Sequence, residues 1–435
     1  MRLYDTATRS LQELPARPGP VRMYFCGPTV YARAHIGNAR PFVIAMWLRR
    51  WLHENGYDVT LVHNITDIND KIYAAAPGHS AELAEQASGW YIEDTGDLGL
   101  GQPDYEPKAT ETIPEIVALI EELVGRGLAY PAGGDVYFRV SGFPDYGALS
   151  GRLDEESARN PSEEEERNEL KEDPRDFALW KAHKEGEDTW WESPWGRGRP
   201  GWHIECSAMA EKFLGPAFEI HGGGLDLVFP HHENERAQSR GAGREFAHAW
   251  MHNGMLRFVG EKMSKSLGNV VTLRDALDEW GRETLLVYFL GGHWRKPIDY
   301  SDDALEQAAA QAESFRNVFR GASEPVGEWE PFAAALDDDF NTPEALAVMH
   351  GWRDHELLRR GLEVFGLESL AETEVAPAEV VDLARRRAEA RERKDFAEAD
   401  RLRVEIEAAG WEARDVDAEP GFQLVPKAPT WRRRP

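Results

Sequence analysis

Cysteine is scarce in this chain: only Cys26 and Cys206 occur among its 435 residues. Two cysteines cannot build a disulfide framework for so long a chain, so a reducing compartment, the cytoplasm, is expected. The sequence also has no apolar run near the roughly 20 residues that a membrane-spanning helix needs. Residues 1–15 carry charges and no continuous apolar stretch, which is unlike a secretory signal. We therefore expect a soluble cytoplasmic protein with no membrane partner.

Positive charge is in deficit. The chain has 50 Lys and Arg residues against 77 Asp and Glu residues, a formal net charge of −27. This balance argues against nucleic-acid binding over the whole surface, because phosphate contacts need Lys and Arg. Acid is concentrated at residues 154–176, whereas basic residues gather late, at 385–387, 391, 393–394 and 432–434. RNA binding is therefore still open for the C-terminal part of the chain.

The amino-terminal region has the pattern of a βαβ unit. Residues 21–25 predict a strand that ends at Cys26, residues 41–52 have helical periodicity, and residues 57–64 predict a second strand. A strand, helix and strand in succession predict an α/β protein with a parallel sheet, whose functional groups lie at the carboxyl ends of the strands. The length of the chain predicts two or three domains.

The character of the sequence changes twice further along. Between residues 129 and 199, short aromatic strands, turns and the acidic stretch predict an insertion into the sheet domain. From residue 302 onward we expect helices and no strands, and residues 383–409 predict highly charged helical structure.

Four residues have the chemistry of a metal site. Cys26 ends the first strand, and Cys206 follows the insertion. The segment from Pro230 has the pattern of a helix beginning, on which His231 and Glu235 share a face because they are four residues apart. Two thiolates, one imidazole and one carboxylate suit zinc. Two buried structural cysteines beside a capped helix, or a redox pair, are the alternatives that spacing alone leaves open.

Three segments are candidates for binding phosphate or nucleotide. His35, Gly37 and Asn38 lie between a strand and a helix, where backbone N–H groups and the helix dipole favour an anion. Lys262 and Lys265 belong to a Lys-Met-Ser-Lys-Ser string that can neutralise a pyrophosphate leaving group. The glycine-rich segment at residues 221–224 could admit an adenine ring to the backbone. A turn with a solvated histidine, an ordinary polar loop and a flexible turn are the respective alternatives.

Taken together and in order, these residues resemble the class I aminoacyl-tRNA synthetases, and among them the cysteinyl-tRNA synthetase family. The resemblance covers nearly the whole chain. Its motifs are Phe25-Cys26-Gly27-Pro28-Thr29-Val30-Tyr31, His35-Ile36-Gly37-Asn38-Ala39-Arg40-Pro41-Phe42, Asn64-Ile65-Thr66-Asp67-Ile68-Asn69-Asp70-Lys71, Gly201-Trp202-His203-Ile204-Glu205-Cys206-Ser207-Ala208-Met209, Phe229-Pro230-His231-His232-Glu233-Asn234-Glu235 and Lys262-Met263-Ser264-Lys265-Ser266.

The resemblance implies a reaction in which cysteine attacks the α-phosphate of ATP to give cysteinyl-adenylate, followed by transfer to tRNA(Cys). One zinc ion per chain and ATP with Mg²⁺ are implied, as is a monomer without an editing domain. The implied ligands of zinc are Cys26, Cys206, His231 and Glu235. Cysteine would lie against Cys26, Gly27, Thr66 and Trp202. ATP would contact His35, Gly37, Asn38, His221, Gly222, Gly223 and Lys265, and the implied catalytic groups are His35, Asn38, Lys262 and Lys265.

The resemblance also implies a domain order. A Rossmann-like catalytic domain in two halves (residues 1–128 and 200–255) is interrupted by a connective insertion (129–199). A junction with the lysine loop (256–300), a helical bundle (301–380) and an anticodon-binding region (381–435) follow. Trp411 and Trp431 are candidate platforms for unstacked anticodon bases. Asn69 departs from the family pattern, where Asp is expected.

Two rival functions fit part of the same pattern. A ligase that joins cysteine to an amino sugar in mycothiol synthesis shares the sheet, the zinc site and the lysine loop. The segments at residues 28–31 and 35–38, and the C-terminal region, argue against it. The other rival is a non-catalytic paralogue that binds RNA or metal. The presence of Lys262, Lys265 and all four candidate zinc ligands argues against that rival.

Overall fold

The structure is a computed structural model that describes residues 1–152, 168–258, 261–262, 271–372, 375–416 and 420–426. The acidic residues around Glu163, the loop residue Lys265 and Trp431 lie outside this part of the chain, and Lys262 lies in strand β12 (Glu261–Lys262). The chain divides into two compact units. The first comprises residues 1–314 and 323–368, and the second comprises residues 315–322 and 369–435.

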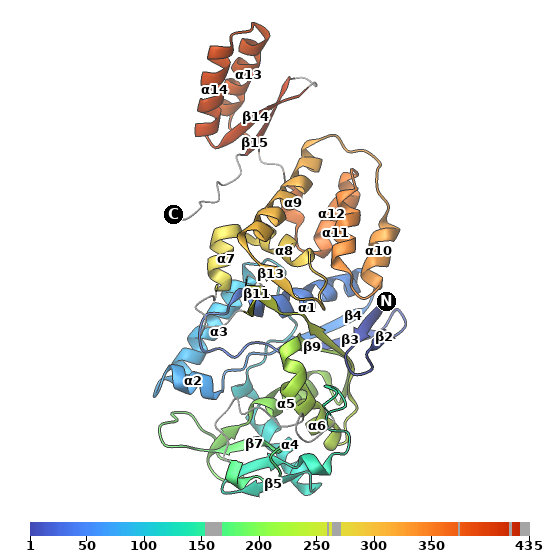
Figure 1. The fold of residues 1–435 in the computed structure, drawn as a ribbon, viewed down its shortest axis with the longest axis vertical. Helices are drawn as coiled ribbons and strands as arrows, with labels where there is room; N and C mark the ends of the chain where they lie inside the picture. The colour runs from blue at the N-terminus through green and yellow to red at the C-terminus, as the bar shows by residue number, and fades with distance from the viewer. Residues whose placement is uncertain (153–167, 259–260, 263–270, 373–374, 417–419, 427–435) are drawn as a thin grey trace. The chain divides into compact units, whose positions relative to one another are not determined.

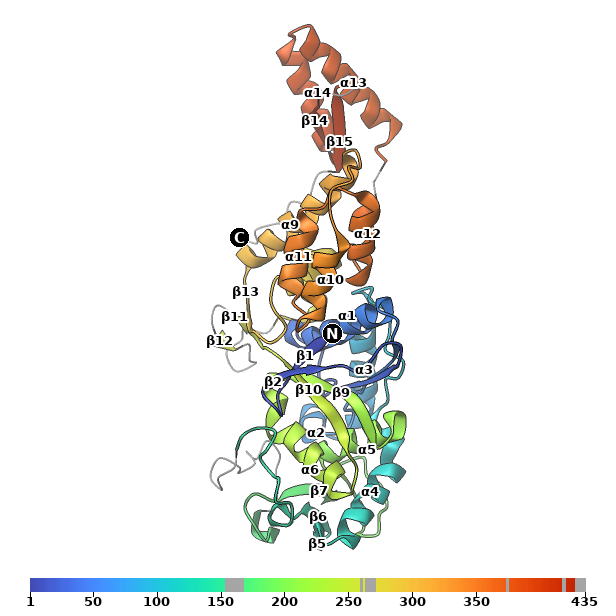
Figure 2. The same ribbon diagram turned by 90° about the vertical axis from the view of Figure 1, so that its right-hand side faces the viewer.

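A four-stranded parallel sheet forms the centre of the first unit. Its strand order is β10 (Phe246–Asn253), β9 (Ala217–Gly224), β3 (Pro20–Phe25) and β4 (Asp58–His63). Figure 1 labels β9, β3 and β4, and Figure 2 labels β10 beside β9. Helix α1 (Ile36–Glu54) connects β3 to β4. The parallel α/β architecture predicted from the sequence is therefore confirmed. The carboxyl ends of β3 and β4 are in register, since Phe25 pairs with His63.

Helices cover both faces of this sheet. On one face Tyr24 and Val62 belong to the same buried cluster as Ile204 and Met209 of α5 (Trp202–Leu214). On the other face the ring of Phe42 in α1 lies 5.5 Å from that of His63. Because successive side chains of a strand point to opposite faces, His63 and its neighbours in sequence serve different sides of the sheet. Helices α2 (Asp70–Ala75) and α3 (Ser80–Gly96) follow β4, and the hairpin of β1 (Arg2–Asp5) and β2 (Ser10–Glu13) precedes β3.

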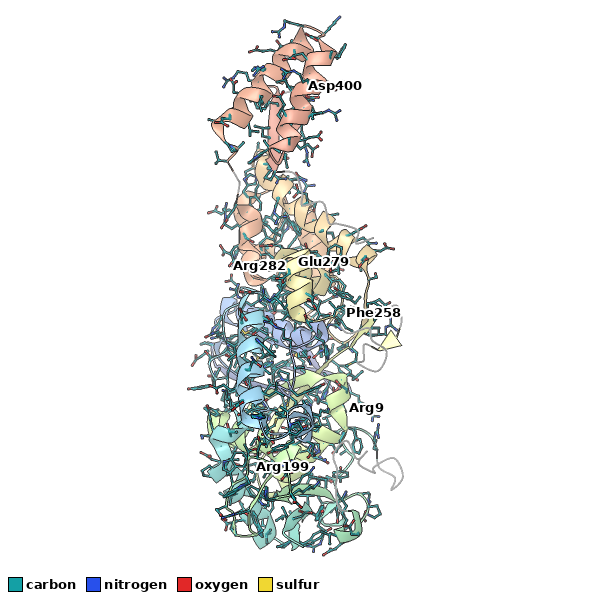
Figure 3. All side chains as sticks on the ribbon, turned by 90° about the vertical axis from the view of Figure 1, so that its left-hand side faces the viewer. Arg9, Arg199, Phe258, Glu279, Arg282 and Asp400 are labelled. Carbon is teal, nitrogen blue, oxygen red and sulfur yellow. The ribbon has the colours of Figure 1, made fainter. Side chains whose placement is uncertain are left out.

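An antiparallel sheet occupies the chain between α4 (Ile113–Gly125) and α5. Its order is β5 (Ala129–Ala132), β6 (Asp135–Phe138), β7 (Phe177–Ala182) and β8 (Gly198–Pro200). Arg199, labelled in Figure 3, is 1% exposed and forms ion pairs with Asp70 of α2 and with Glu187. Lys181 of β7 also pairs with Asp70, at 3.1 Å. Two buried cations of the antiparallel sheet, Lys181 and Arg199, thus attach it to the half-buried Asp70, which follows β4.

Beyond β10 the chain becomes mostly helical. Strands β12, β11 (Leu256–Phe258) and β13 (Ile298–Tyr300) form a small sheet. Helices α7 (Leu273–Trp280) and α8 (Arg282–Leu290) lie between β12 and β13 in the sequence. Arg282, labelled in Figure 3, donates to the carbonyl of Gly366 at 2.6 Å. Helices α9 (Asp302–Arg320), α10 (Trp329–Asp337), α11 (Thr342–His350) and α12 (His355–Val364) follow, as seen in Figure 2. None of the helices that the structure describes is long and apolar enough to cross a membrane.

The second unit confirms the helical prediction for residues 383–409 and corrects one other expectation. Helices α13 (Ala378–Glu392) and α14 (Phe396–Ala408) are separate, because Lys394 has a φ of 59° and Asp395 caps α14 by accepting from the Glu398 N–H. The expectation of no strands after residue 302 is wrong. This unit contains a hairpin of β14 (Trp411–Asp415) and β15 (Phe422–Pro426). Asp400 marks α14 in Figure 3.

Trp411 contributes to the core of this second unit. Its side chain is 8% exposed and packs in a cluster with Ile406 and Phe422. A ring so covered leaves no open face for a base to stack on, which corrects its interpretation as a platform for an anticodon base.

Candidate functional site

Four residues from separate elements converge beside the carboxyl end of β3. Cys26 follows β3 directly, Cys206 lies in α5, His231 lies in a π-helical turn (Val228–His232), and Glu235 lies in the first turn of α6 (Glu233–Gly241). Their ligand atoms all lie within 4.8 Å of one another, and all four side chains are buried. The structure thus brings together the four residues that the sequence marked as a metal site.

Glu235 is the centre of this cluster. Its carboxylate is fully buried, with Oε1 3.1 Å from His231 Nε2 and 3.6 Å from Cys26 Sγ. The other oxygen, Oε2, lies 2.9 Å from His221 Nε2. A buried carboxylate without a positive partner is costly, so these contacts place Glu235 where a cation would balance its charge.

The helix that carries Glu235 begins later than the sequence predicts. Residues 228–232 form the π-helical turn, and α6 starts at Glu233 rather than at Pro230. His231 and Glu235 nevertheless meet, whereas His232 Nδ1 lies 2.7 Å from His252 Nε2. Cys26, His221, His232 and Glu235 form a second set of donors within 4.8 Å of one another. The two sets share Cys26 and Glu235.

Burial keeps this histidine-rich region uncharged. It lowers the pKa of His231 and of His252 to about 3, and lowers that of His232 well below its ordinary value. The same desolvation, together with the neighbouring Cys206, raises the pKa of the Cys26 thiol well above its ordinary value. Neutral imidazoles are the form that binds a metal, whereas a thiol must first release its proton.

Two residues that support the cluster were missed in the sequence. His203 Nδ1 lies 2.9 Å from His231 Nδ1, and Asn64 Oδ1 accepts the Gly27 N–H at 3.0 Å while lying 3.8 Å from Cys206 Sγ. Signals for both were present. Asn64 directly follows strand β4, and His203 precedes Cys206 by three residues, which places both on one face of a helix.

A cleft of about 370 Å³ opens beside the cluster. Of the described residues predicted to bind substrates, some line it and others do not. Those in its lining are Cys26, Gly27, His35, Gly37, Asn38 and Trp202, and those outside it are Thr66, His221, Gly222 and Gly223. Trp202 connects the cleft to the cluster, because its indole stacks on His231 with ring centres 4.2 Å apart.

The wall of the cleft at the start of α1 is built around His35. This residue caps the helix, with its backbone N–H donating to Asn38 Oδ1 at 3.2 Å. A Cβ at position 37 would lie 2.9 Å from two ring atoms of His35. Gly37 is therefore needed for the imidazole to lie over the first helical turn, where the N-terminal end of the dipole favours an anion.

The residues outside the cleft serve as supports. The Thr66 side chain is buried, and its backbone N–H and carbonyl pair with Pro28 and Val30, so Thr66 backs the loop that forms the cleft wall. His221 is fully buried, between Glu235 and the ring of Trp250 at 4.7 Å.

Packing explains why glycine occupies the two central positions of residues 221–224. A Cβ on Gly222 would lie 2.2 Å from the ring of Phe25, and one on Gly223 would lie 2.9 Å from Leu227. Close packing of β9 against its neighbours therefore accounts for both glycines.

Comparison with known proteins gives two family matches. A family model described as "tRNA synthetases class I (C) catalytic domain" matches residues 12–310, and a DALR domain model matches residues 331–367. The chain is 46% identical to the curated cysteine--tRNA ligase of Halorhodospira halophila, over 96% of each protein. It is 47% identical to that of Alkalilimnicola ehrlichii, also over 96% of each. Among solved structures, Mycobacterium tuberculosis methionyl-tRNA synthetase in complex with methionyl-adenylate shares the fold, with a TM-score of 0.59 and 15% identity over 81% of this chain and 88% of that one.

Proposed function

Since this chain belongs to the cysteine--tRNA ligase family of class I aminoacyl-tRNA synthetases, we propose that its Cys26, Cys206, His231 and Glu235 hold a zinc ion that selects the amino acid. The activity of the chain is the ATP-dependent activation of cysteine to cysteinyl-adenylate and its transfer to tRNA(Cys). The observation that carries the zinc proposal is the convergence of four buried donor atoms within 4.8 Å.

The donor set fits zinc in number and chemistry. Zinc prefers sulfur and nitrogen ligands and takes four of them in closed sites. The unbalanced buried carboxylate of Glu235 fits the same conclusion, because a dication would compensate its charge. The second donor set contains one cysteine instead of two, and we favour the first because two thiolates suit zinc better.

Zinc addresses a discrimination that shape alone handles poorly. Serine differs from cysteine by one atom, and a pocket separates such near-isosteres weakly. When bound, zinc supplies a ligand position that a soft thiolate fills far better than an alcohol, which stays protonated at neutral pH. Selection at binding makes an editing domain unnecessary.

The chain's own residues position the two substrates. Trp202 and Gly27 border the cleft next to the cluster and would hold the cysteine backbone, while Thr66 would act by fixing the loop at residues 28–30. His35, Gly37 and Asn38 would take the ATP phosphates at the start of α1. We propose that Lys262 and Lys265 neutralise the negative charge of the leaving pyrophosphate. His221, Gly222 and Gly223 are reassigned from ATP contact to packing.

Catalysis then rests on orientation and charge stabilisation, without a covalent enzyme intermediate. The carboxylate of cysteine attacks the α-phosphate and pyrophosphate leaves. A hydroxyl of the terminal ribose of the tRNA then attacks the cysteinyl carbonyl carbon, and AMP leaves. ATP would act with Mg²⁺. A monomer in the cytoplasm is our proposal for the working form, and the two free thiols of the cluster suit that reducing compartment.

Charging of tRNA tests this function directly. The purified chain should attach cysteine to tRNA(Cys) and should discriminate against serine. Ligation of cysteine to an amino sugar without tRNA charging would favour the mycothiol ligase instead. RNA binding without any cysteine-dependent ATP–pyrophosphate exchange would favour the non-catalytic paralogue. The match of curated relatives along 96% of the chain favours the first outcome.

A further inference from the structure

Arg33 brings to the cleft a positive charge that the binding of cysteine described above does not use. It lies in the cleft lining, two residues before His35. Its guanidinium carbon lies 5.3 Å from the centre of the Trp90 ring, and its side chain is 31% exposed. The residue is thus held against an aromatic face while keeping access to the cleft.

A single buried carboxylate fixes the direction of this guanidinium. Arg33 Nη1 donates to Asp94 Oδ1 at 2.7 Å and to Oδ2 at 3.0 Å. Asp94 is fully buried in α3, so the pair is poorly screened by water. Nη2 lies 3.8 Å from Glu93 Oε2, and Nε takes no part in the Asp94 pair. Two nitrogens of the planar fork therefore stay outside the short hydrogen bonds.

Asp94 also holds the helix that lies against the same wall of the cleft. Arg274 of α7 donates to Asp94 Oδ1 at 2.9 Å. Next to it, the Ile36 N–H donates to the Val271 carbonyl at 3.0 Å, and the Leu273 N–H donates to the Ala34 carbonyl at 2.9 Å. The backbone just after Arg33 is thus attached to residues 271–273, and its guanidinium is oriented by Asp94 before any ligand arrives.

Charge indicates which ligand this arrangement serves. The chain has a formal net charge of −27, which repels an anionic nucleotide at long range. Arg33 and Lys71 are the Arg and Lys residues that line the described cleft, against one acidic residue there, Asp226. Because Arg33 carries a fork that matches phosphate oxygens, it is the better suited of the two for a directed contact.

We propose that Arg33 binds the triphosphate of ATP, and that Asp94 is a positioning residue that holds its guanidinium towards the cleft. This inference rests on the proposed function, because that function places ATP at the start of α1. Loss of one charge-assisted contact corresponds to roughly a tenfold loss of affinity.

The test uses the full-length protein and two readouts. ATP affinity is measured by titration calorimetry, and the KM for ATP and for cysteine is measured by ATP–pyrophosphate exchange. Arg33→Gln should weaken ATP binding and raise the KM for ATP by about tenfold, with the KM for cysteine within about twofold of the parent. Arg33→Lys keeps a positive charge beside Asp94 but lacks the planar guanidinium, so it should lose less ATP affinity than Arg33→Gln does. It provides the same test if Arg33→Gln does not fold.

Matched controls separate a role in binding from a role in stability. Arg126→Gln removes an exposed ion pair with Glu122 in α4, away from the cleft, and should leave ATP affinity unchanged. Asp97→Asn removes one partner of Arg274 and leaves Asp94 in place, so ATP affinity should also stay within about twofold.

Three outcomes would overturn the proposal. They are unchanged ATP affinity in a folded Arg33→Gln protein, a rise in the KM for cysteine alone, and a defect confined to tRNA charging. A parent protein that binds ATP through Arg33 but shows no exchange would instead contradict the proposed function while the inference stands.

Discussion

The Nδ1 atoms of His203 and His231 lie 2.9 Å apart. For His231 to bind a metal through Nε2, the atom that faces Glu235, its proton must reside on Nδ1. His203 Nδ1 must then accept that proton's hydrogen bond. A residue outside the donor set thus determines which tautomer the metal site presents.

Replacing His203 should therefore weaken metal binding while all four ligands remain. We expect His203→Phe, which keeps a ring between Trp202 and Phe177, to lower zinc affinity by roughly tenfold to a hundredfold. Competition with a chromophoric chelator measures this change. His248→Asn, at an exposed position of β10, is the control. Equal affinities for the two variants would contradict the tautomer argument.

Removing a donor should have a larger effect. The purified chain is expected to hold about one zinc ion, and Cys206→Ser is expected to lose it on dialysis, because an alcohol does not replace a thiolate ligand. Metal analysis by mass spectrometry checks this. Ser207→Ala, at the neighbouring buried position that binds Gln238, should keep the metal. Full zinc retention in Cys206→Ser would refute the ligand assignment.

The second unit should matter for tRNA and not for activation. A chain that ends at Glu368 removes α13, α14 and their hairpin, where basic residues are plentiful, and leaves the cleft residues in place. We expect cysteine-dependent ATP–pyrophosphate exchange within about twofold of the parent, and charging efficiency lower by at least about tenfold. Undiminished charging would exclude an RNA contact in the removed part.

Acid should destabilise the metal-free protein partly through His63. Burial lowers its pKa from the ordinary 6.5 to about 4, because desolvation outweighs the raising effect of the backbone of His63 and Asn64. Above pH 6.5 the folded and unfolded chains both hold His63 neutral. Below pH 6.5 His63 becomes protonated in the unfolded chain but stays neutral in the folded chain. The free energy of unfolding therefore falls as the pH is lowered to about 4.

Calorimetric unfolding of His63→Phe at pH 7.5 and pH 5.0 measures this contribution. Relative to the variant, the parent should lose about 2 kcal/mol of unfolding free energy between the two pH values. Asn64 follows in sequence but carries no titratable group, so Asn64→Ala should leave the pH dependence as it is in the parent. Parallel losses in the parent and in His63→Phe would contradict the buried neutral imidazole.

The strands of the sheet and part of the metal site were predictable where the pattern involves residues close together in the sequence. The strands on either side of α1 follow from short apolar segments, and the contact between His231 and Glu235 follows from helical spacing even though α6 begins at Glu233. The meeting of Cys26 and Cys206 joins residues far apart in sequence. Composition could not reveal it, and the family resemblance supplied it.

Other features could not be predicted because they depend on tertiary packing. Gly222 belongs to a glycine run typical of a ligand loop, yet the ring of Phe25 occupies the space beside it. The strands of the last hairpin carry charged residues such as Glu412 and Arg414, so their apolar alternation is weak. The role of Trp411 as a stacking platform requires an exposed ring. In the structure, apolar residues of helices α13 and α14 cover this ring.

The attachments of the first strands have a consequence for synthesis of the chain. Strand β3 pairs with β9, the Ile36 N–H bonds to the Val271 carbonyl, and the Tyr4 N–H bonds to the Asp339 side chain. During synthesis these strands must therefore wait for partners that are made hundreds of residues later. Such a high contact order slows folding and exposes apolar strands to aggregation, so chaperone demand during translation is built into the topology.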